Sequence, residues 1–428
     1  MNAATVPAVR PWAWIPTLYF AQGLPYVVVM TLTVILYKNL GVSNADIALY
    51  TSWLYLPWVV KPLWSPVVEL LGTKREWVVT LQFAVGAALA LVALTLPVDR
   101  FFQLSLAVFW LMAFASATHD IAADGFYLLA LSEKEQAAFV GVRSAFYRAA
   151  MIAGQGGLVF LAGSLAELTG DTKLAWQLVF GVLAVLFVLL FAWHRNVLPR
   201  PPSDGPVKAA GGFAAGFLET FRSFFARKDI LLVLAFLLTF RLGEAQGLKL
   251  VTPFLLDPKA EGGLALTTAQ VGLVYGTVGI LALTVGGILG GLAISRHGLA
   301  RWLWPMVLAV HVPNLAFVWL AHAQPGDPAL VAGVIAIEQF GYGFGFAAYL
   351  MYMIGVADGP HKTAHYALCT GFMALGMMLP GMVSGWIQEW LGYPKFFLWV
   401  CACTIPSIIV TAFLRIDPAF GRRGRGAS

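Results

Sequence analysis

Two carboxylates and two guanidinium groups lie close together in a part of the chain that is otherwise apolar. Asp120 and Asp124 are four residues apart, and Arg143 and Arg148 follow after one predicted turn. Side chains four residues apart lie on one face of a helix. Charges inside a membrane-spanning helix are costly, face the bundle interior, and mark a pathway, a proton relay or a gate. These residues therefore predict ion pairs that serve proton or solute movement.

The two charged segments are expected to pair with each other. Counted from the predicted turn between their helices, Asp124 and Arg143 lie at similar depth, and so do Asp120 and Arg148. One interpretation is an inner gate or proton relay whose pairs break and form. The other is a permanent structural ion network. His119 lies on a different helical face from Asp120 and is a further candidate for a proton role.

Further charged residues fall inside apolar runs, among them Arg241, Glu244, Lys61 and Glu338. Arg241 and Glu244 are three residues apart, so they either neutralise each other on one helix face or one binds substrate while the other sets its pKa. Lys61 precedes a proline, and a buried lysine there needs a carboxylate partner or an anionic ligand. Glu338 is the best candidate for a protonatable carboxylate that couples transport to a proton gradient.

Polar and aromatic residues beside these charges are candidates for binding a solute. Gln22-Gly-Leu-Pro-Tyr26 is a polar break at mid-depth of the first apolar run, of the kind that lines a cavity. Gln339 and Tyr342 follow Glu338 in a segment with three alternate glycines, which allow close helix contact or bending. The predicted substrate-binding residues are Gln22, Tyr26, Lys61, Arg241, Gln339 and Tyr342.

The composition determines the class of protein that must position these residues. The chain has 428 residues, 60% of them hydrophobic and 11% charged, with a mean hydropathy of +0.79. Soluble domains carry about 25% charged residues. The composition predicts an all-α membrane protein with many spans. The net charge of +6 comes from basic residues scattered among short loops, which does not indicate nucleic-acid binding.

Apolar runs of about 20 residues are long enough to span a bilayer. The first run, 12–37, is too long for a signal-peptide core and is expected to be a retained span. Twelve spans are predicted in all, at 12–37, 45–71, 77–97, 102–130, 137–166, 174–195, 229–256, 268–295, 300–322, 329–356, 364–390 and 394–415.

The distribution of lysine and arginine predicts the orientation. If the N-terminus is cytoplasmic, seventeen of the 27 lysines and arginines fall in inside segments and five in outside loops. Cytoplasmic loops carry the excess of basic residues, so both termini are predicted to be cytoplasmic. The predicted domains are a six-helix half at 1–198, a cytoplasmic linker at 199–228 and a second half at 229–428. Within the linker, phenylalanines at helical spacing predict a helix at 213–225 that lies on the membrane interface. The alternative is a loop that only carries apolar side chains.

The sequence shows no pattern of an enzyme or of a cofactor site. It has no Gly-x-x-x-x-Gly-Lys-Ser/Thr loop for ATP, and its histidines and cysteines lack metal-ligand spacing. The three cysteines, all in apolar runs, form no disulfide framework. No metal and no cofactor are expected. Active transport would then depend on an ion gradient, most simply one of protons.

Two clusters of glycine, serine and basic residues, 64–75 and 290–301, repeat in the two predicted halves. Together with twelve spans, cytoplasmic termini and a central linker, they resemble the major facilitator superfamily. Shorter motifs resemble the AmpG-type muropeptide permeases within it. These motifs are Ala21–Tyr26, Lys61–Pro66, Asp120–Asp124 leading to Tyr147-Arg148, Arg241–Glu244, Glu338–Gly341 and Ala364–Leu368.

This resemblance implies a proton-driven symporter of the bacterial inner membrane that imports an anhydromuropeptide or a related glycan fragment by alternating access. Its partners would be the solute, protons and lipid, and a monomer without nucleic acid is expected. Arg241 and Glu244 replace the Lys and Asp that are usual in that family, and Leu129 stands where it tends to have a further acidic residue. Alternatives are an importer of a siderophore or an acyl-CoA-like solute, or a non-transporting membrane sensor.

Overall fold

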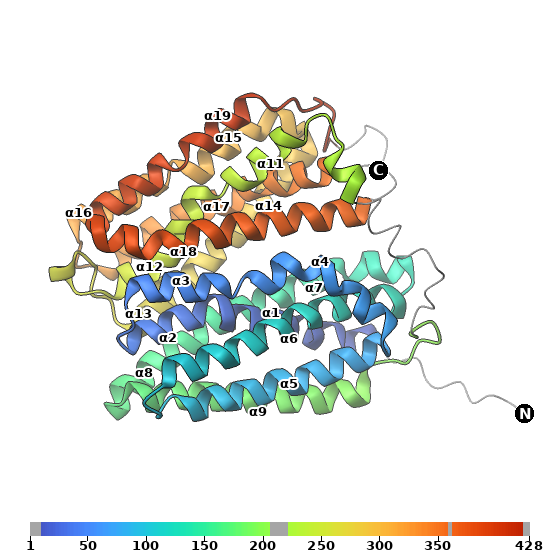
Figure 1. Ribbon diagram of the computed structural model, residues 1–428, viewed down its shortest axis with the longest axis horizontal. Coiled ribbons are helices and arrows are strands. Elements are labelled where there is room, and N and C mark those ends of the chain that lie inside the picture. Colours follow the sequence, from blue (N-terminus) through green and yellow to red (C-terminus); the bar gives the residue numbers. More distant parts are fainter. Residues whose placement is uncertain (1–9, 206–220, 358–361, 423–428) are drawn as a thin grey trace, which may run out of the picture. The chain divides into compact units, whose positions relative to one another are not determined.

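The computed structural model describes residues 10–205, 221–357 and 362–422, and the regular structure in these ranges is helical (Figure 1). The helices up to residue 205 are α1 (Ile15–Val27), α2 (Thr33–Asn39), α3 (Asn44–Trp53), α4 (Leu56–Leu70), α5 (Lys74–Thr95), α6 (Phe101–Ala130), α7 (Glu133–Met151), α8 (Val159–Thr169) and α9 (Thr172–Val197). The later helices are α11 (Ile230–Thr239), α12 (Leu242–Leu256), α13 (Thr268–Val271), α14 (Ile280–His297), α15 (Leu299–His311), α16 (Asn314–Ala323), α17 (Pro328–Val356), α18 (Lys362–Ala402) and α19 (Ile405–Ala412).

Ten helical segments in the described ranges are long and apolar enough to cross a membrane. The all-α, multi-pass class is therefore confirmed, but the count differs from the predicted twelve. The predicted span 45–71 forms two short helices, α3 and α4, neither of which reaches 18 residues. The predicted spans 364–390 and 394–415 are counted as one, His365–Ala412, although Gly392 interrupts it with a φ of 72°.

Polar residues at the helix starts explain where several spans begin. Ser43 caps α3 by accepting a hydrogen bond from the backbone N–H of Asp46. Thr73 caps α5 and Ser132 caps α7, and in each case the side chain of a glutamate three residues later accepts a hydrogen bond from the backbone N–H of the cap. Such capping boxes satisfy backbone donors that the first helical turn leaves unpaired. The short loops between the apolar runs thereby set the ends of the spans.

Several spans depart from regular α-helix. The segments Val28–Leu32, Ile152–Leu158 and Gly272–Gly279 are π-helical, and π-helical turns occur frequently at functional sites. Helix α1 runs through the polar segment Gln22–Tyr26, and the π-helical turn begins at Val28. Proline at position 25 removes one backbone donor just before that turn.

The alternate glycines of α17 allow close helix contact. A Cβ atom on Gly341 would lie 2.2 Å from the carbonyl oxygen of Ala309, and one on Gly343 would lie 2.1 Å from that of Leu283. Both distances are shorter than atoms tolerate, so only glycine lets α17 pack this closely against α15 and α14.

The predicted interfacial helix is only partly covered. Residues 213–220 lie outside the described residues, and 221–225 are helical. Phe224, one of the phenylalanines of that pattern, is buried in the protein, with its ring stacked 6.2 Å from that of Phe372. Helical spacing indicates an apolar face but not which surface covers it, and here α18 covers Phe224.

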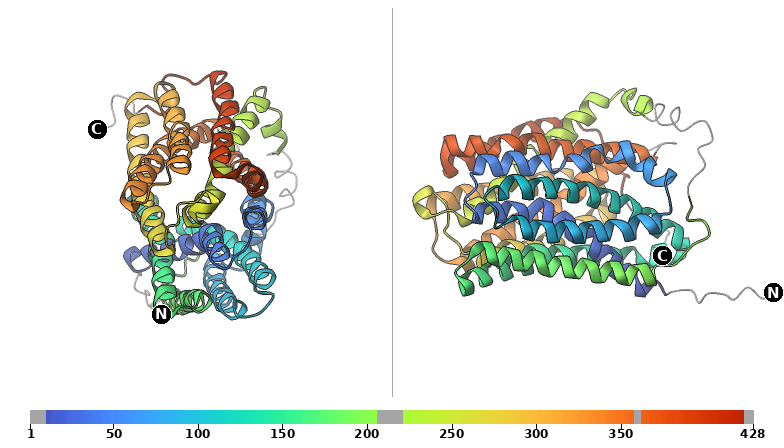
Figure 2. Two further views of the ribbon diagram at one scale, coloured as in Figure 1. Left: turned by 90° about the vertical axis from the view of Figure 1, so that its left-hand side faces the viewer. Right: turned by 60° about the horizontal axis from the view of Figure 1, so that its bottom comes forward.

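Contacts between residues group the chain into two compact units. The first unit comprises 1–32 and 63–209, and the second comprises 33–62 and 210–428. In the first, α5 packs against α6 and α9, and α1 packs against α7. In the second, α18 packs against α3 and α12, while α17 packs against α14 and α15. Within each unit the helices run side by side along a common direction (Figure 2). The predicted domain boundaries stay a prediction.

Candidate functional site

The first unit brings together one of the two predicted ion pairs. The guanidinium Nη2 of Arg143 on α7 lies 2.9 Å from Oδ1 of Asp124 on α6. The hydroxyl of Tyr19 donates a hydrogen bond of 3.3 Å to the same oxygen. The guanidinium also lies over two aromatic rings, 4.5 Å from the centroid of Tyr19 and 5.1 Å from that of Tyr127. The predicted contact between Asp124 and Arg143 is therefore confirmed.

The exposure of this pair bears on its function. The side chains of Arg143 and Asp124 are 29% and 43% exposed. The pair is therefore not sealed inside the first unit. Its role, as a gate or relay or as part of a permanent ion network, stays a prediction.

Asp120 is held by a residue from the predicted substrate-binding set. The side-chain amide of Gln22 on α1 donates a hydrogen bond to Oδ1 of Asp120. The amide oxygen of Gln22 is buried and has no hydrogen-bond partner among the described residues. A buried acceptor without a donor is costly, so this oxygen is suited to receive an N–H or O–H group from a ligand. The pairing of Asp120 with Arg148 stays a prediction, and so does the role of Tyr26, which is partly exposed on α1.

His119 belongs to a separate buried chain of hydrogen bonds. Gln82 on α5 lies between two histidines: its Nε2 is 3.1 Å from Nε2 of His119, and its Oε1 is 2.8 Å from Nδ1 of His194. Nε2 of His194 in turn lies 2.9 Å from the hydroxyl of Thr17. With this orientation of the amide, Nε2 of His119 accepts a hydrogen bond and Nδ1 of His194 donates one. Sequence reasoning missed Gln82 and His194, because nothing in their spacing indicates a contact across four helices.

In the second unit, Arg241 and Glu244 form a self-neutralising pair at a helix break. Arg241 interrupts the span between α11 and α12, and Glu244 lies in the first turn of α12. The guanidinium makes two hydrogen bonds to the carboxylate, at 2.9 and 2.5 Å, and a third of 2.9 Å to the hydroxyl of Tyr342 on α17. Discontinuous helices line the solute sites of many transporters. Arg241 and Glu244 therefore neutralise each other, as one of the two interpretations predicted, and they do so where the helix is interrupted between α11 and α12.

Glu338 has a different environment. Its carboxylate accepts a hydrogen bond of 2.9 Å from the side-chain amide of the neighbouring Gln339. Among the described residues, no lysine or arginine forms a salt bridge with it. A carboxylate inside a membrane span marks a functional site by default, and the role of Glu338 in proton coupling stays a prediction. Lys61, on α4, is partly buried, and its role stays a prediction.

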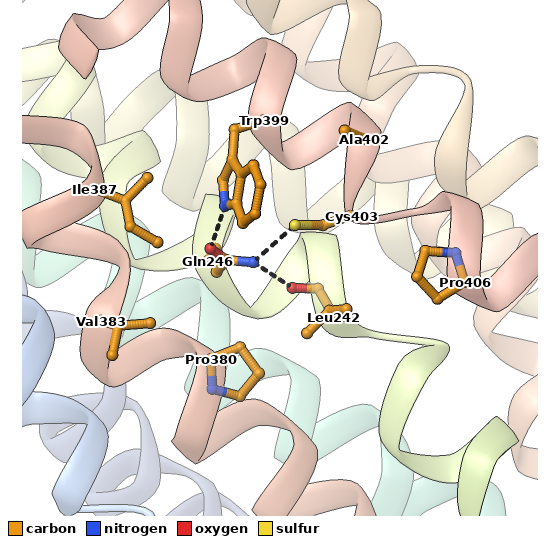
Figure 3. A pocket seen from close by; sticks show the side chains of 9 residues that line it. All are labelled: Leu242, Gln246, Pro380, Val383, Ile387, Trp399, Ala402, Cys403 and Pro406. Carbon is orange, nitrogen blue, oxygen red and sulfur yellow. Dashed lines mark hydrogen bonds between the residues drawn. The ribbon is translucent and has the colours of Figure 1, made fainter. Parts of the chain in front are cut away.

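A cavity of about 380 Å³ lies in the second unit between α12, α18 and α19 (Figure 3). Its polar lining residue is Gln246, whose amide bonds to Leu242, Cys403 and Trp399 (Figure 3). The rest of the lining is apolar and comprises Leu242, Pro380, Val383, Ile387, Trp399, Ala402, Cys403 and Pro406. None of the predicted site residues lines this cavity. In the described part of the chain, no three histidine, cysteine or acidic residues gather as metal ligands would.

Comparisons with known proteins identify the family. A profile described as Major Facilitator Superfamily matches residues 17–367, more than half of the chain. The chain belongs to the Major Facilitator Superfamily. The "Anhydromuropeptide permease" of Escherichia coli (strain K12) is 26% identical to this transporter over 404 residues, covering 92% of this chain and 78% of that protein. The "Putative transporter AmpG 4" of Rickettsia conorii is 24% identical over 412 residues, covering 92% and 94%.

A solved structure supports the fold. A mutant of the nucleoside transporter NupG superimposes with a TM-score of 0.71 at 16% identity, covering 94% of this chain and 99% of that one. The resemblance to AmpG-type permeases is confirmed by these relatives, and this protein is a secondary transporter of the Major Facilitator Superfamily. The prediction that it is not an enzyme is confirmed as well, because the superfamily consists of transporters.

Proposed function

We propose that this transporter is a proton-coupled symporter that imports an anhydromuropeptide, or a related peptidoglycan or glycan fragment, across the bacterial inner membrane. The observation that carries the proposal is the 26% identity to the anhydromuropeptide permease of Escherichia coli over 92% of the chain. The relatives are bacterial and the chain is a multi-pass membrane protein, which favours the inner membrane.

The proposed topology has twelve spans in two six-helix halves, 1–198 and 229–428, joined by a linker at 199–228. The ten candidate spans support this topology, and two segments account for the two further spans. The segment 44–70 is long enough to cross as a broken helix, and His365–Ala412 has 48 residues, enough for two crossings that meet at Gly392. The excess of basic residues in alternate loops supports cytoplasmic termini.

The proposed roles follow from the charges. Glu338 would carry the coupling proton, because the described residues give it an amide partner but no cation. Asp124 and Arg143, with Asp120 and Arg148, would form a gate, supported by the exposed salt bridge between the first two. Glu244, which forms a salt bridge with Arg241, would take part in proton coupling or gating. Solute would bind to Gln22, Tyr26, Lys61, Arg241, Gln339 and Tyr342.

Uptake into proteoliposomes tests this function. Vesicles containing the purified transporter are given a labelled anhydromuropeptide, with and without an inward proton gradient. Accumulation that depends on the gradient is the expected result. Binding without accumulation would favour a sensor. If folded protein shows neither, the muropeptide proposal is wrong, and the same vesicles then test a siderophore and an acyl-CoA as solutes.

A further inference from the structure

A cationic side chain outside the predicted site is buried in the second unit without a carboxylate beside it. Lys249 on α12 is 3% exposed. Its ammonium group donates a hydrogen bond of 3.0 Å to the hydroxyl of Thr51 on α3 and lies 5.1 Å from the ring centroid of Tyr55. Among the described residues, no carboxylate forms a salt bridge with it. Its charge is therefore uncompensated by any nearby anion in this part of the chain.

The hydrogen bonds around Lys249 leave donors in excess. An ammonium group has three N–H donors and no acceptor. The hydroxyl of Thr51 donates its own hydrogen to the carbonyl oxygen of Ile47 at 2.6 Å, so it serves Lys249 as the acceptor of one of these three. The described contacts supply no acceptor for the other two. An acceptor with negative charge would pair with the ammonium group and accept from these remaining donors.

A second donor without a partner lies in the same place. The hydroxyl of Ser52 on α3 is fully buried and has no hydrogen-bond partner among the described residues. Gly381 on α18 borders both groups: a Cβ atom there would lie 2.7 Å from Oγ of Ser52 and 3.5 Å from Cγ of Lys249. Because residue 381 has no side chain, α18 can approach both groups closely at this position. Donors from α3 and α12 thus meet beside a glycine of α18.

We propose that Lys249 and Ser52 form a subsite that binds a carboxylate group of the transported solute. The proposal rests on the proposed function, in that it assigns an anionic group to the same solute. A carboxylate has two oxygens with several lone pairs, so a single group can accept from both side chains and supply the missing counter-charge. The subsite would make this transporter selective for acidic over neutral forms of its solute.

Transport of two forms of one solute tests the subsite. Proteoliposomes are given an anhydromuropeptide with free carboxylates, or the same molecule with its carboxylates converted to amides. Lys249→Gln is expected to raise the KM for the acidic form about tenfold or more and to leave that for the amide form unchanged. Ser52→Ala is expected to raise the same KM by several fold without loss of folding, because it removes a hydroxyl that bonds to nothing else. Lys395→Gln removes an exposed lysine from α18 and serves as the control.

A binding measurement separates this inference from the proposed function. The melting temperature of the purified transporter is measured in sodium acetate and in sodium chloride of equal ionic strength. Acetate is expected to stabilise the unmodified protein more than chloride does, and this difference is expected to vanish in Lys249→Gln. That result without muropeptide uptake would refute the proposed function and keep the subsite. The subsite proposal is wrong if Lys249→Gln and Ser52→Ala transport the solute with an unchanged preference for its acidic form. It is also wrong if acetate and chloride stabilise the unmodified protein equally.

Discussion

The ammonium group of Lys38 lies 2.5 Å from Oδ1 of Asp257, so a salt bridge joins the end of α2 to the residue that caps α12. The two side chains are 16% and 6% exposed. The other carboxylate oxygen accepts hydrogen bonds from Tyr393 at 2.6 Å and from Asn44 at 3.4 Å, and Asn44 also bonds to Gln388 at 2.8 Å. This network ties the segment 33–62 to α12 and α18 within the second unit.

Replacing Asp257 with asparagine is expected to destabilise the transporter by about 2 kcal/mol. Breaking a fully buried pair costs roughly 3–5 kcal/mol, and the cost is smaller here because Lys38 keeps some access to solvent. Unfolding of the purified protein in denaturant measures the change. Glu167→Gln alters an exposed glutamate on α8 and is expected to stay within about 0.5 kcal/mol. Equal stability of the two variants would contradict the importance of the network.

The pair Asp124 and Arg143 is expected to matter more for transport than for stability. A double-mutant cycle with Asp124→Asn and Arg143→Gln should give a coupling energy below about 1 kcal/mol in unfolding, because neither side chain is buried in the protein. The same variants should lower gradient-driven uptake at least tenfold if the pair is a gate. A large coupling energy with unchanged uptake would instead identify a structural ion pair.

Glu338→Gln is expected to abolish accumulation driven by a proton gradient. Glutamine keeps the size of the side chain but cannot carry a proton, while exchange of labelled for unlabelled solute needs no net proton movement. Exchange should therefore survive in the variant, and Glu167→Gln should behave as the unmodified protein does. Accumulation by Glu338→Gln at the normal rate would remove Glu338 from the coupling mechanism.

Gly385→Ala is expected to destabilise the second unit by about 1–3 kcal/mol, the usual cost of overpacking. A Cβ atom at this position of α18 would lie 2.3 Å from the carbonyl oxygen of Asn44 on α3. Gly291→Ala is the matched control, because a Cβ atom there meets nothing within 4 Å in α14. That change should stabilise by about 0.5–1 kcal/mol through helix propensity alone. Thermal unfolding of both variants decides whether α3 and α18 are packed this closely.

The cap of α7 is expected to make stability depend on acidic pH. Glu135, which lies before the candidate span Gly141–Thr169, accepts hydrogen bonds from the hydroxyl of Ser132 at 2.7 Å and from its backbone N–H at 2.9 Å. These bonds lower the pKa of Glu135 below its ordinary value of 4.5. A carboxyl whose pKa is lower in the folded state stabilises the protein above the ordinary value, and this contribution disappears as the pH falls through the folded value.

Glu135→Gln should remove this pH dependence. The stability advantage of the unmodified protein over the variant, measured by unfolding at a series of pH values, is expected to shrink between about pH 5 and pH 3. Ser132→Ala should reduce the dependence as well, because it removes the first of the two bonds. A constant difference across that range would show that the ionised form of Glu135 is not favoured by folding.

The sequence by itself determined the class of the protein and most of its spans. Apolar runs of 20 residues with few charges have no stable alternative to membrane-spanning helices, so this much follows from local composition. The sequence also predicted one contact of the candidate site. Asp124 and Arg143 are 19 residues apart, on either side of one turn, and counting the helical rise from that turn places them at the same depth. Such contacts can be predicted because the chain between the partners is short and regular.

The tertiary structure alone decided the contacts between distant segments. Lys249 bonds to Thr51 at a separation of 198 residues, and Asn44 bonds to Asp257 at a separation of 213. Helical periodicity assigns a side chain to a face of its own helix but not to the helix that covers that face. That choice depends on how all the helices pack at once. For this reason the sequence alone indicated neither the burial of Phe224 under α18 nor the contact of Lys249 with Thr51.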